Sequence, residues 1–75
     1  MSKILSKELF KSLIKRYESQ IQSNKTMMMI YFDKSVGIGE HPQHIEELDK
    51  MLEEITEAND KLEYLQSEIS FENYK

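Results

Sequence analysis

Residues 37–42 read Gly37-Ile38-Gly39-Glu40-His41-Pro42, and they hold both glycines and the single proline of this 75-residue chain. Glycine permits the positive φ angle at which many helices end, while proline suits the first position of a helix. The proline also moves His41 away from helical geometry, toward the role of a cap. We therefore predict a turn over residues 35–41, with four structural residues: Gly37, Gly39, His41 and Pro42.

Long segments without a helix breaker flank this turn on both sides. In the first, apolar residues and one asparagine recur at alternating spacings of four and three, which places them on one face of a helix. They are Phe10, Ile14, Tyr17, Ile21, Asn24, Met28 and Tyr31. The matching stripe of the second segment consists of Ile45, Leu48, Leu52, Ile55, Ala58 or Asn59, Leu62, Leu65 and Ile69. We predict one all-α domain over residues 1–75, an antiparallel helical hairpin with helices over about 6–34 and about 42–70.

Two features of the first segment leave its details open. Residues 23–26 are four poor helix formers in a row, so the helix could kink there. Residues 27–32 are six apolar residues without alternation, and we favour helix over strand because the sequence offers no partner strand. Two helices with one apolar stripe each bury too little surface to be stable alone. Three solutions remain: a kink near 23–26 that makes a small three-helix bundle, a second copy that completes a four-helix bundle, or a partner protein.

The charges of the two segments differ in sign. Residues 1–37 carry seven Lys or Arg against three Asp or Glu, and residues 38–75 carry three against eleven. In an antiparallel hairpin, residue n faces about residue 76 − n, which brings the basic start of the chain level with Asp60, Glu63 and Glu68. The same register predicts a hydrogen bond between Tyr17 and Asn59. Exposed ion pairs contribute little energy each, so the charges mainly select the hairpin over a straight rod.

Composition argues against several classes of protein. The chain has no cysteine, so it has neither disulfides nor thiolate metal ligands. No apolar run approaches the ~18 residues of a membrane-spanning helix, and lysines interrupt the first apolar positions, where a signal peptide has its hydrophobic region. We expect a soluble, cytoplasmic protein without membrane contact. The formal net charge of −4 argues against nucleic-acid binding by the whole surface.

Residues that commonly carry chemistry are sparse. His41 and His44 lie near Glu40 and Glu47, but helical zinc ligands favour a spacing of four residues, and His41 is expected to cap the helix. The glycines at residues 37–39 lack the third glycine and the Lys-Ser or Lys-Thr of a phosphate-binding loop. The sequence shows no nucleophile with a paired base. We predict no enzymatic activity, no metal, no cofactor and no small-molecule substrate.

Three surfaces are candidates for contact with a partner. A row of cations could follow DNA phosphates or could be a solvated face, and it consists of Lys3, Lys7, Lys11 and Lys15, with Arg16 beside it. A flexible apolar surface for a protein partner is formed by Met27, Met28 and Met29. An acidic face that could imitate a DNA backbone includes Glu53, Glu54 and Glu57.

A family resemblance begins at the turn. The chain reads from Val36 to Pro42 into an acidic helix that contains Ala58-Asn59-Asp60-Lys61-Leu62-Glu63. In these features residues 36–65 resemble the family of short helical proteins encoded beside the UvsW recombination helicase in tailed phages of the T-even type. The resemblance implies a small helical bundle in the cytoplasm of an infected bacterium, associated with phage DNA recombination and repair. It does not imply helicase activity, since the chain has no nucleotide-binding motif.

The sequence therefore predicts a non-enzymatic helical interaction protein, accessory to phage DNA recombination and repair through protein contacts or weak DNA contacts. The alternative is a phage inhibitor of a host protein, which uses the acidic second helix as a nucleic-acid mimic or the methionines as a wedge. In both interpretations the partner is another protein or a second copy of the chain, as in a homodimer.

Overall fold

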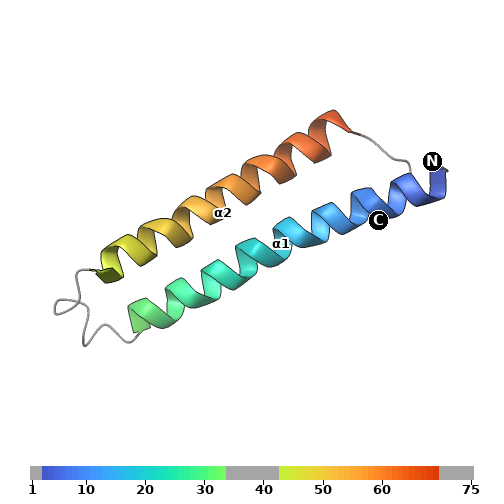
Figure 1. Ribbon diagram of the computed structural model, residues 1–75. Coiled ribbons are helices and arrows are strands. Elements are labelled where there is room, and N and C mark those ends of the chain that lie inside the picture. Colours follow the sequence, from blue (N-terminus) through green and yellow to red (C-terminus); the bar gives the residue numbers. More distant parts are fainter. Residues whose placement is uncertain (1–2, 34–42, 70–75) are drawn as a thin grey trace.

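The chain forms an all-α helical hairpin in a computed structural model that describes residues 3–33 and 43–69 (Figure 1). Helix α1 spans Lys3–Asp33, and helix α2 spans Gln43–Glu68. The helices run antiparallel, side by side, in a rod with extents of 54 × 17 × 17 Å. The predicted fold class is confirmed, and the helix ends lie within about three residues of the predicted ones. The predicted turn and its residues Gly37, Gly39, His41 and Pro42 lie outside the described residues.

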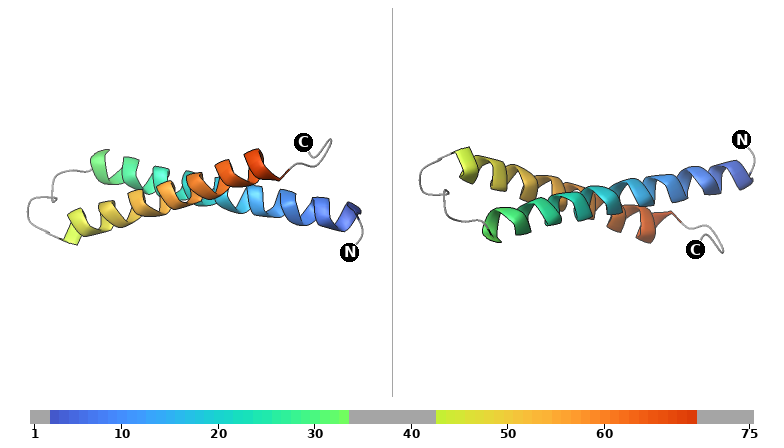
Figure 2. Two further views of the ribbon diagram at one scale, coloured as in Figure 1. Left: turned by 90° about the horizontal axis from the view of Figure 1, so that it is seen from above. Right: turned by 90° about the horizontal axis from the view of Figure 1, so that it is seen from below.

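Helix α1 is continuous through residues 23–26, where the sequence allowed a kink (Figure 2). Two of the polar side chains there, those of Asn24 and Thr26, have partners that are compatible with an intact helix. Asn24 Nδ2 donates to a backbone carbonyl one turn earlier at 2.8 Å and to Glu54 Oε1 on α2 at 3.2 Å. Gln22 Nε2 donates to Thr26 Oγ1 at 3.1 Å. Tertiary contacts thus override a low helix propensity, and the kinked three-helix alternative does not hold.

One face of α1 packs against α2, and it is the face that the sequence predicts. Phe10 and Ile14 are buried, and the other five predicted residues are half-buried: Tyr17, Ile21, Asn24, Met28 and Tyr31. We call this row, together with its counterpart on α2, the seam. Its spacing averages 3.5 residues, the repeat of two helices that pack knobs into holes. The apolar run of residues 27–32 is helical, so its members divide between the seam and the outside.

The seam of α2 differs from the predicted stripe. It contains His44, Leu48, Met51, Ile55, Ala58, Leu62 and Leu65. The sequence places Ile45 and Leu52 in it, but these side chains are 63% and 49% exposed, because the residue before each of them takes the seam position. Ile69 is also exposed. The sequence did not decide between Ala58 and Asn59 for one position of the predicted stripe, and Ala58 occupies it with an exposed fraction of 1%. The prediction of Ile45 and Leu52, which was based on their hydrophobicity, was wrong. The 3.5-residue repeat that matches α1 instead places His44 and Met51 in the seam.

Contacts across the seam define the register of the two helices. Tyr31 lies edge-on to His44 with ring centroids 5.2 Å apart, and Lys61 Nζ lies 5.4 Å from the centroid of the Tyr17 ring. The residue numbers of these pairs add to 75 and 78, close to the predicted 76. The predicted Tyr17–Asn59 hydrogen bond is wrong, because Asn59 is exposed and Lys61 lies against the Tyr17 ring instead.

Candidate interaction surfaces

The hairpin buries little of its own apolar surface. Among the described residues, the buried hydrophobic side chains are those of Phe10, Ile14 and Ala58, while twelve large hydrophobic side chains are exposed. Single exposed apolar residues are ordinary on protein surfaces, but contiguous apolar patches mark contact sites for other macromolecules. The candidate functional sites are therefore the places where these exposed side chains gather.

The seam divides the rod into two sides. Consecutive residues of a helix point about 100° apart, so a residue directly after a seam residue lies on one side and a residue directly before one lies on the other. Because the helices are antiparallel, residues that follow the seam in α1 and in α2 lie on the same side of the rod. We call these two surfaces the following side and the preceding side.

The following side carries an apolar patch near the end where α1 stops and α2 begins. It consists of Met29 and Phe32 on α1 and of Ile45 and Leu52 on α2, and we call it the loop-end patch. Met29 and Phe32 are each 61% exposed. Phe32 and Ile45 each follow one of the two rings that contact each other across the seam, so they lie at the same level of the rod.

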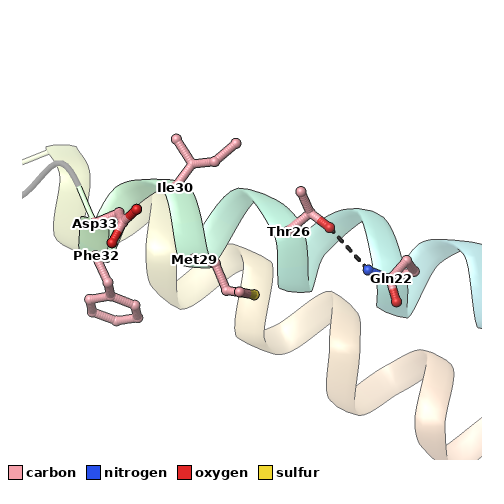
Figure 3. Close-up of a pocket in the computed structure, with 6 residues that line it drawn as sticks. All are labelled: Gln22, Thr26, Met29, Ile30, Phe32 and Asp33. Carbon is pink, nitrogen blue, oxygen red and sulfur yellow. Dashed lines mark hydrogen bonds between the residues drawn. The ribbon is translucent and has the colours of Figure 1, made fainter.

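An open hollow of about 610 Å³ extends this patch along the outer face of α1 (Figure 3). It is lined by Gln22, Thr26, Met29, Ile30, Phe32 and Asp33. Figure 3 shows Met29 and Phe32 pointing to one side of α1 and Ile30 pointing to the opposite side. The hydrogen bond between Gln22 and Thr26 forms a polar end of the hollow.

Acidic side chains surround the loop-end patch. Asp33 lines the hollow, and Glu46, Asp49 and Glu53 are exposed on the first three turns of α2. Lys25 lies at the inner end of the patch and is also exposed. The carboxylates therefore outnumber the cation around the loop-end patch.

The cations that the sequence proposed for DNA contact do not form one outward strip. Lys7 and Lys11 are half-buried, and Lys11 Nζ pairs with a glutamate one turn earlier at 3.3 Å. Lys15 follows a seam residue and Arg16 precedes one, so these exposed side chains lie on opposite sides of the rod. The side chain of Lys3 lies outside the described part of the chain. A row of cations that turns around the helix in this way is a poor track for a phosphate backbone.

The three methionines are also distributed rather than gathered. Met28 packs in the seam, Met27 lies exposed on the preceding side, and Met29 lies exposed on the following side. The sequence proposed them as one adaptable surface, but three consecutive residues of a helix cannot share a face. Met29 alone belongs to the loop-end patch.

The acidic residues selected from the sequence differ in their contacts. Glu53 and Glu57 are exposed, while Glu54 accepts the hydrogen bond from Asn24 and so helps to join the helices. Sequence reasoning missed a second carboxylate of this kind, Glu47, which accepts a hydrogen bond from the Tyr31 hydroxyl. That hydrogen bond raises the pKa of Tyr31 above its usual value of 10.0, with smaller contributions from desolvation and from the charge of Glu47. The antiparallel register could have revealed this pair.

Comparison with protein-family models, curated proteins and solved structures finds no match for this chain. Within residues 3–33 and 43–69, no group of three or more His, Asp or Glu side chains is placed to hold a metal ion. In the same part of the chain, neither helix combines the length and the apolar character that crossing a membrane requires. The exposed apolar surfaces are the most distinctive features of the described residues.

Proposed function

We propose that this protein is a helical interaction module that binds a basic amphipathic helix of a partner protein at the loop-end patch. The observation that supports this most strongly is Phe32, which is 61% exposed beside an open hollow and at the level of the exposed Ile45. Large exposed aromatic side chains of this kind often act as anchors in protein interfaces. A partner helix laid along the following side would become the third helix of a bundle.

The charges around the patch specify the partner further. The apolar side chains have acidic neighbours, namely Asp33, Glu46 and Asp49. Lysines or arginines beside the apolar face of the partner would form ion pairs with these carboxylates. Charge complementarity at the rim mainly accelerates association and selects partners, and salt screens it. Binding should therefore weaken, but not vanish, as the salt concentration rises.

The biological setting of this module is the one that residues 36–65 suggest by resemblance: phage DNA recombination and repair in the cytoplasm of an infected bacterium. In that setting the partner is a protein of DNA metabolism with a basic helix. Inhibition of a host protein would use the same patch and would differ in the origin of the partner. Direct DNA contact is the weaker candidate, because the cations are divided between the two sides of the rod.

Fluorescence anisotropy with a labelled helical peptide tests the proposal. The probe is a peptide of about 20 residues with leucines at i, i+3, i+4 and i+7 and lysines beside them, and its control replaces the lysines by glutamates. Wild-type protein should bind the basic peptide with a Kd on the order of micromolar, and Phe32→Asp should weaken binding roughly tenfold or more. Met27→Asp is the matched control, because it makes the same charge change on the preceding side of the same helix.

Two outcomes would contradict this function. Equal binding of the basic peptide by wild type and by Phe32→Asp would remove the loop-end patch as the binding site. Equal binding of the basic and acidic peptides would remove the charge argument. A parallel measurement with duplex DNA addresses the weaker candidate: salt-sensitive binding that is lost when Lys7, Lys11 and Lys15 become glutamate would favour direct DNA contact instead.

A further inference from the structure

The preceding side of α1 carries a second row of residues with an unusual order. Each member directly precedes a seam residue, so the row runs straight along the rod at the same 3.5-residue repeat. We call it the stripe, and it consists of Leu9, Leu13, Arg16, Gln20, Ser23, Met27 and Ile30. All seven side chains are exposed. Two large apolar residues stand at each end, and three polar residues stand between them.

This order is symmetric about Gln20. Leu9 and Ile30 lie equally far from the centre, as do Leu13 and Met27, and the numbers of each pair add to 39 or 40. A second copy of α1 laid antiparallel on the first therefore places apolar residues opposite apolar residues at both ends. Gln20 then faces Gln20 of the second copy. A surface that is complementary to itself in this way is what a two-fold symmetric interface requires.

We infer that the protein forms a homodimer in which the stripes of two α1 helices pack antiparallel, with the two-fold axis beside Gln20. This inference does not depend on the proposed function, because the four side chains of the loop-end patch lie on the following side; of the residues that line its hollow, Ile30 alone belongs to the stripe. The contact would supply the additional burial that the thin seam lacks. It also explains why apolar residues occupy surface positions on both ends of α1.

A hollow on the preceding side lies where this dimer needs one. It has a volume of about 310 Å³ and is lined by Leu13, Tyr17, Asp60, Lys61, Tyr64 and Leu65. In the antiparallel pairing, Met27 of the second copy comes level with Leu13 and so with this hollow. Methionine is unbranched and flexible, which suits a side chain that enters an irregular apolar gap. The two-fold axis gives the second copy the same contact in return.

Charge selects the antiparallel orientation over the parallel one. A parallel pair would also match apolar ends with apolar ends, but it would place Arg16 beside Arg16 of the second copy and would bring the two basic ends together. In the antiparallel pair, Arg16 comes level with Glu53 and Glu54 on α2 of the second copy, by the register of the hairpin. Opposite charges at the rim favour one orientation and like charges disfavour the other.

The chain exposes more surface than a compact monomer of its size. The chain exposes 6124 Å², whereas a compact monomer of 9.0 kDa exposes about 4,900 Å². The excess of about 1,200 Å² is larger than the roughly 800 Å² that each partner buries in a standard interface. A second copy on the stripe would cover part of this excess.

Cysteine cross-linking of the full chain tests both the dimer and its orientation. The chain has no cysteine of its own, so every disulfide must involve an introduced cysteine. In the antiparallel dimer, residue 13 lies level with residue 27 of the other copy but about 20 Å along the rod from the other residue 13. A mixture of Leu13→Cys and Met27→Cys proteins should therefore form a mixed disulfide under mild oxidation, and Leu13→Cys alone should form little. Self-linking of Leu13→Cys at the rate of the mixed pair would overturn the antiparallel dimer.

Sedimentation across a wide range of protein concentrations gives the second measurement. Wild type should sediment as a dimer, and Leu13→Lys should raise the dimer dissociation constant roughly tenfold or more. Phe32→Lys is the matched control on the following side and should leave dimerisation within about threefold of wild type. Circular dichroism identifies a variant that has lost its helices, and in that case Met27→Lys replaces Leu13→Lys. A wild-type protein that stays monomeric at every concentration would overturn the inference and leave the proposed function standing.

Discussion

The hairpin has a loop-end half, near Asp33 and Gln43, and a terminal half at its other end. The terminal half buries Phe10 and Ile14, whereas the described residues of the loop-end half include no buried side chain. In the loop-end half, the seam combines half-buried apolar residues with an edge-on ring contact between Tyr31 and His44 and a hydrogen bond from Tyr31 to Glu47. The same half keeps several of its largest apolar side chains outside the seam. The comparison indicates that the buried side chains are concentrated in the terminal half, whereas the partner site that we propose lies in the loop-end half.

The largest expected effect tests whether the terminal half carries the stability. Phe10→Ala should lower the free energy of unfolding by about 3 kcal/mol, because it removes a buried aromatic ring and leaves a cavity. Met28→Ala, at a half-buried position of the loop-end half, should cost only about 1 kcal/mol. Urea unfolding followed by circular dichroism, at one fixed protein concentration, measures both. Equal losses would show that the two halves do not differ in packing.

A second prediction concerns the most buried position among the described residues. Ala58 is the most buried residue of the hairpin, so Ala58→Leu should destabilise it by about 2 kcal/mol through overpacking. Asn59→Leu adds a side chain of the same size at the next, exposed position and should change stability by less than about 0.5 kcal/mol. The same urea titrations compare the two variants. An Ala58→Leu protein that is more stable than wild type would mean that the seam has unfilled space at this point.

The predictability of the fold differed between the two helices. The seam of α1 followed from its spacing alone, since Phe10, Ile14 and their successors keep one repeat throughout. The seam of α2 did not, because isoleucine and leucine stand directly after the histidine and the methionine that occupy it. Hydrophobicity cannot choose between neighbours in such a case. Matching the 3.5-residue repeat of α1 would have chosen correctly.

The candidate surfaces were less predictable than the fold. The sequence identified Met29 and the acidic residues of the second helix as contact candidates, but it grouped residues by their closeness in the chain. Phe32 and Ile45 are separated in sequence and come to one level only through the register of the hairpin. Once the seam residues are known, each remaining residue can be assigned to one side of the rod. The loop-end patch then consists of residues directly after seam residues, and the stripe of residues directly before them.

A third prediction concerns the polar seam of the loop-end half. Asn24→Leu removes a hydrogen bond to Glu54, which is exposed and can return to water, and it adds apolar surface to the seam. We therefore expect stability to rise by about 1 kcal/mol, while the register becomes less strictly defined. Urea unfolding measures the first effect, and the spread of backbone amide resonances in NMR spectra measures the second. A clear loss of stability would show that the hydrogen bonds of Asn24 contribute more than burial does.

The smallest expected effect is a dependence of stability on pH that arises from Tyr31 in the loop-end half. The pKa of Tyr31 is raised above the 10.0 of an unfolded tyrosine, first by its hydrogen bond to Glu47. The protonated hydroxyl therefore stabilises the folded state fully below about pH 10, and this contribution is lost as the pH rises through the folded pKa. Alkaline conditions should loosen the loop-end half first. Tyr31→Phe should remove this pH dependence, whereas Tyr64→Phe, which deletes an exposed tyrosine of the terminal half, should keep it.

Tyrosinate absorbance measured against pH tests this directly, because the difference between wild type and Tyr31→Phe isolates one phenol. That phenol should titrate above pH 10.0, and Glu47→Gln should bring its midpoint down, since the amide keeps an acceptor oxygen but loses the charge. If Glu47→Gln leaves the midpoint unchanged, the carboxylate does not reach Tyr31 in solution. The loop-end half would then lack one of the polar contacts that set it apart from the buried half around Phe10.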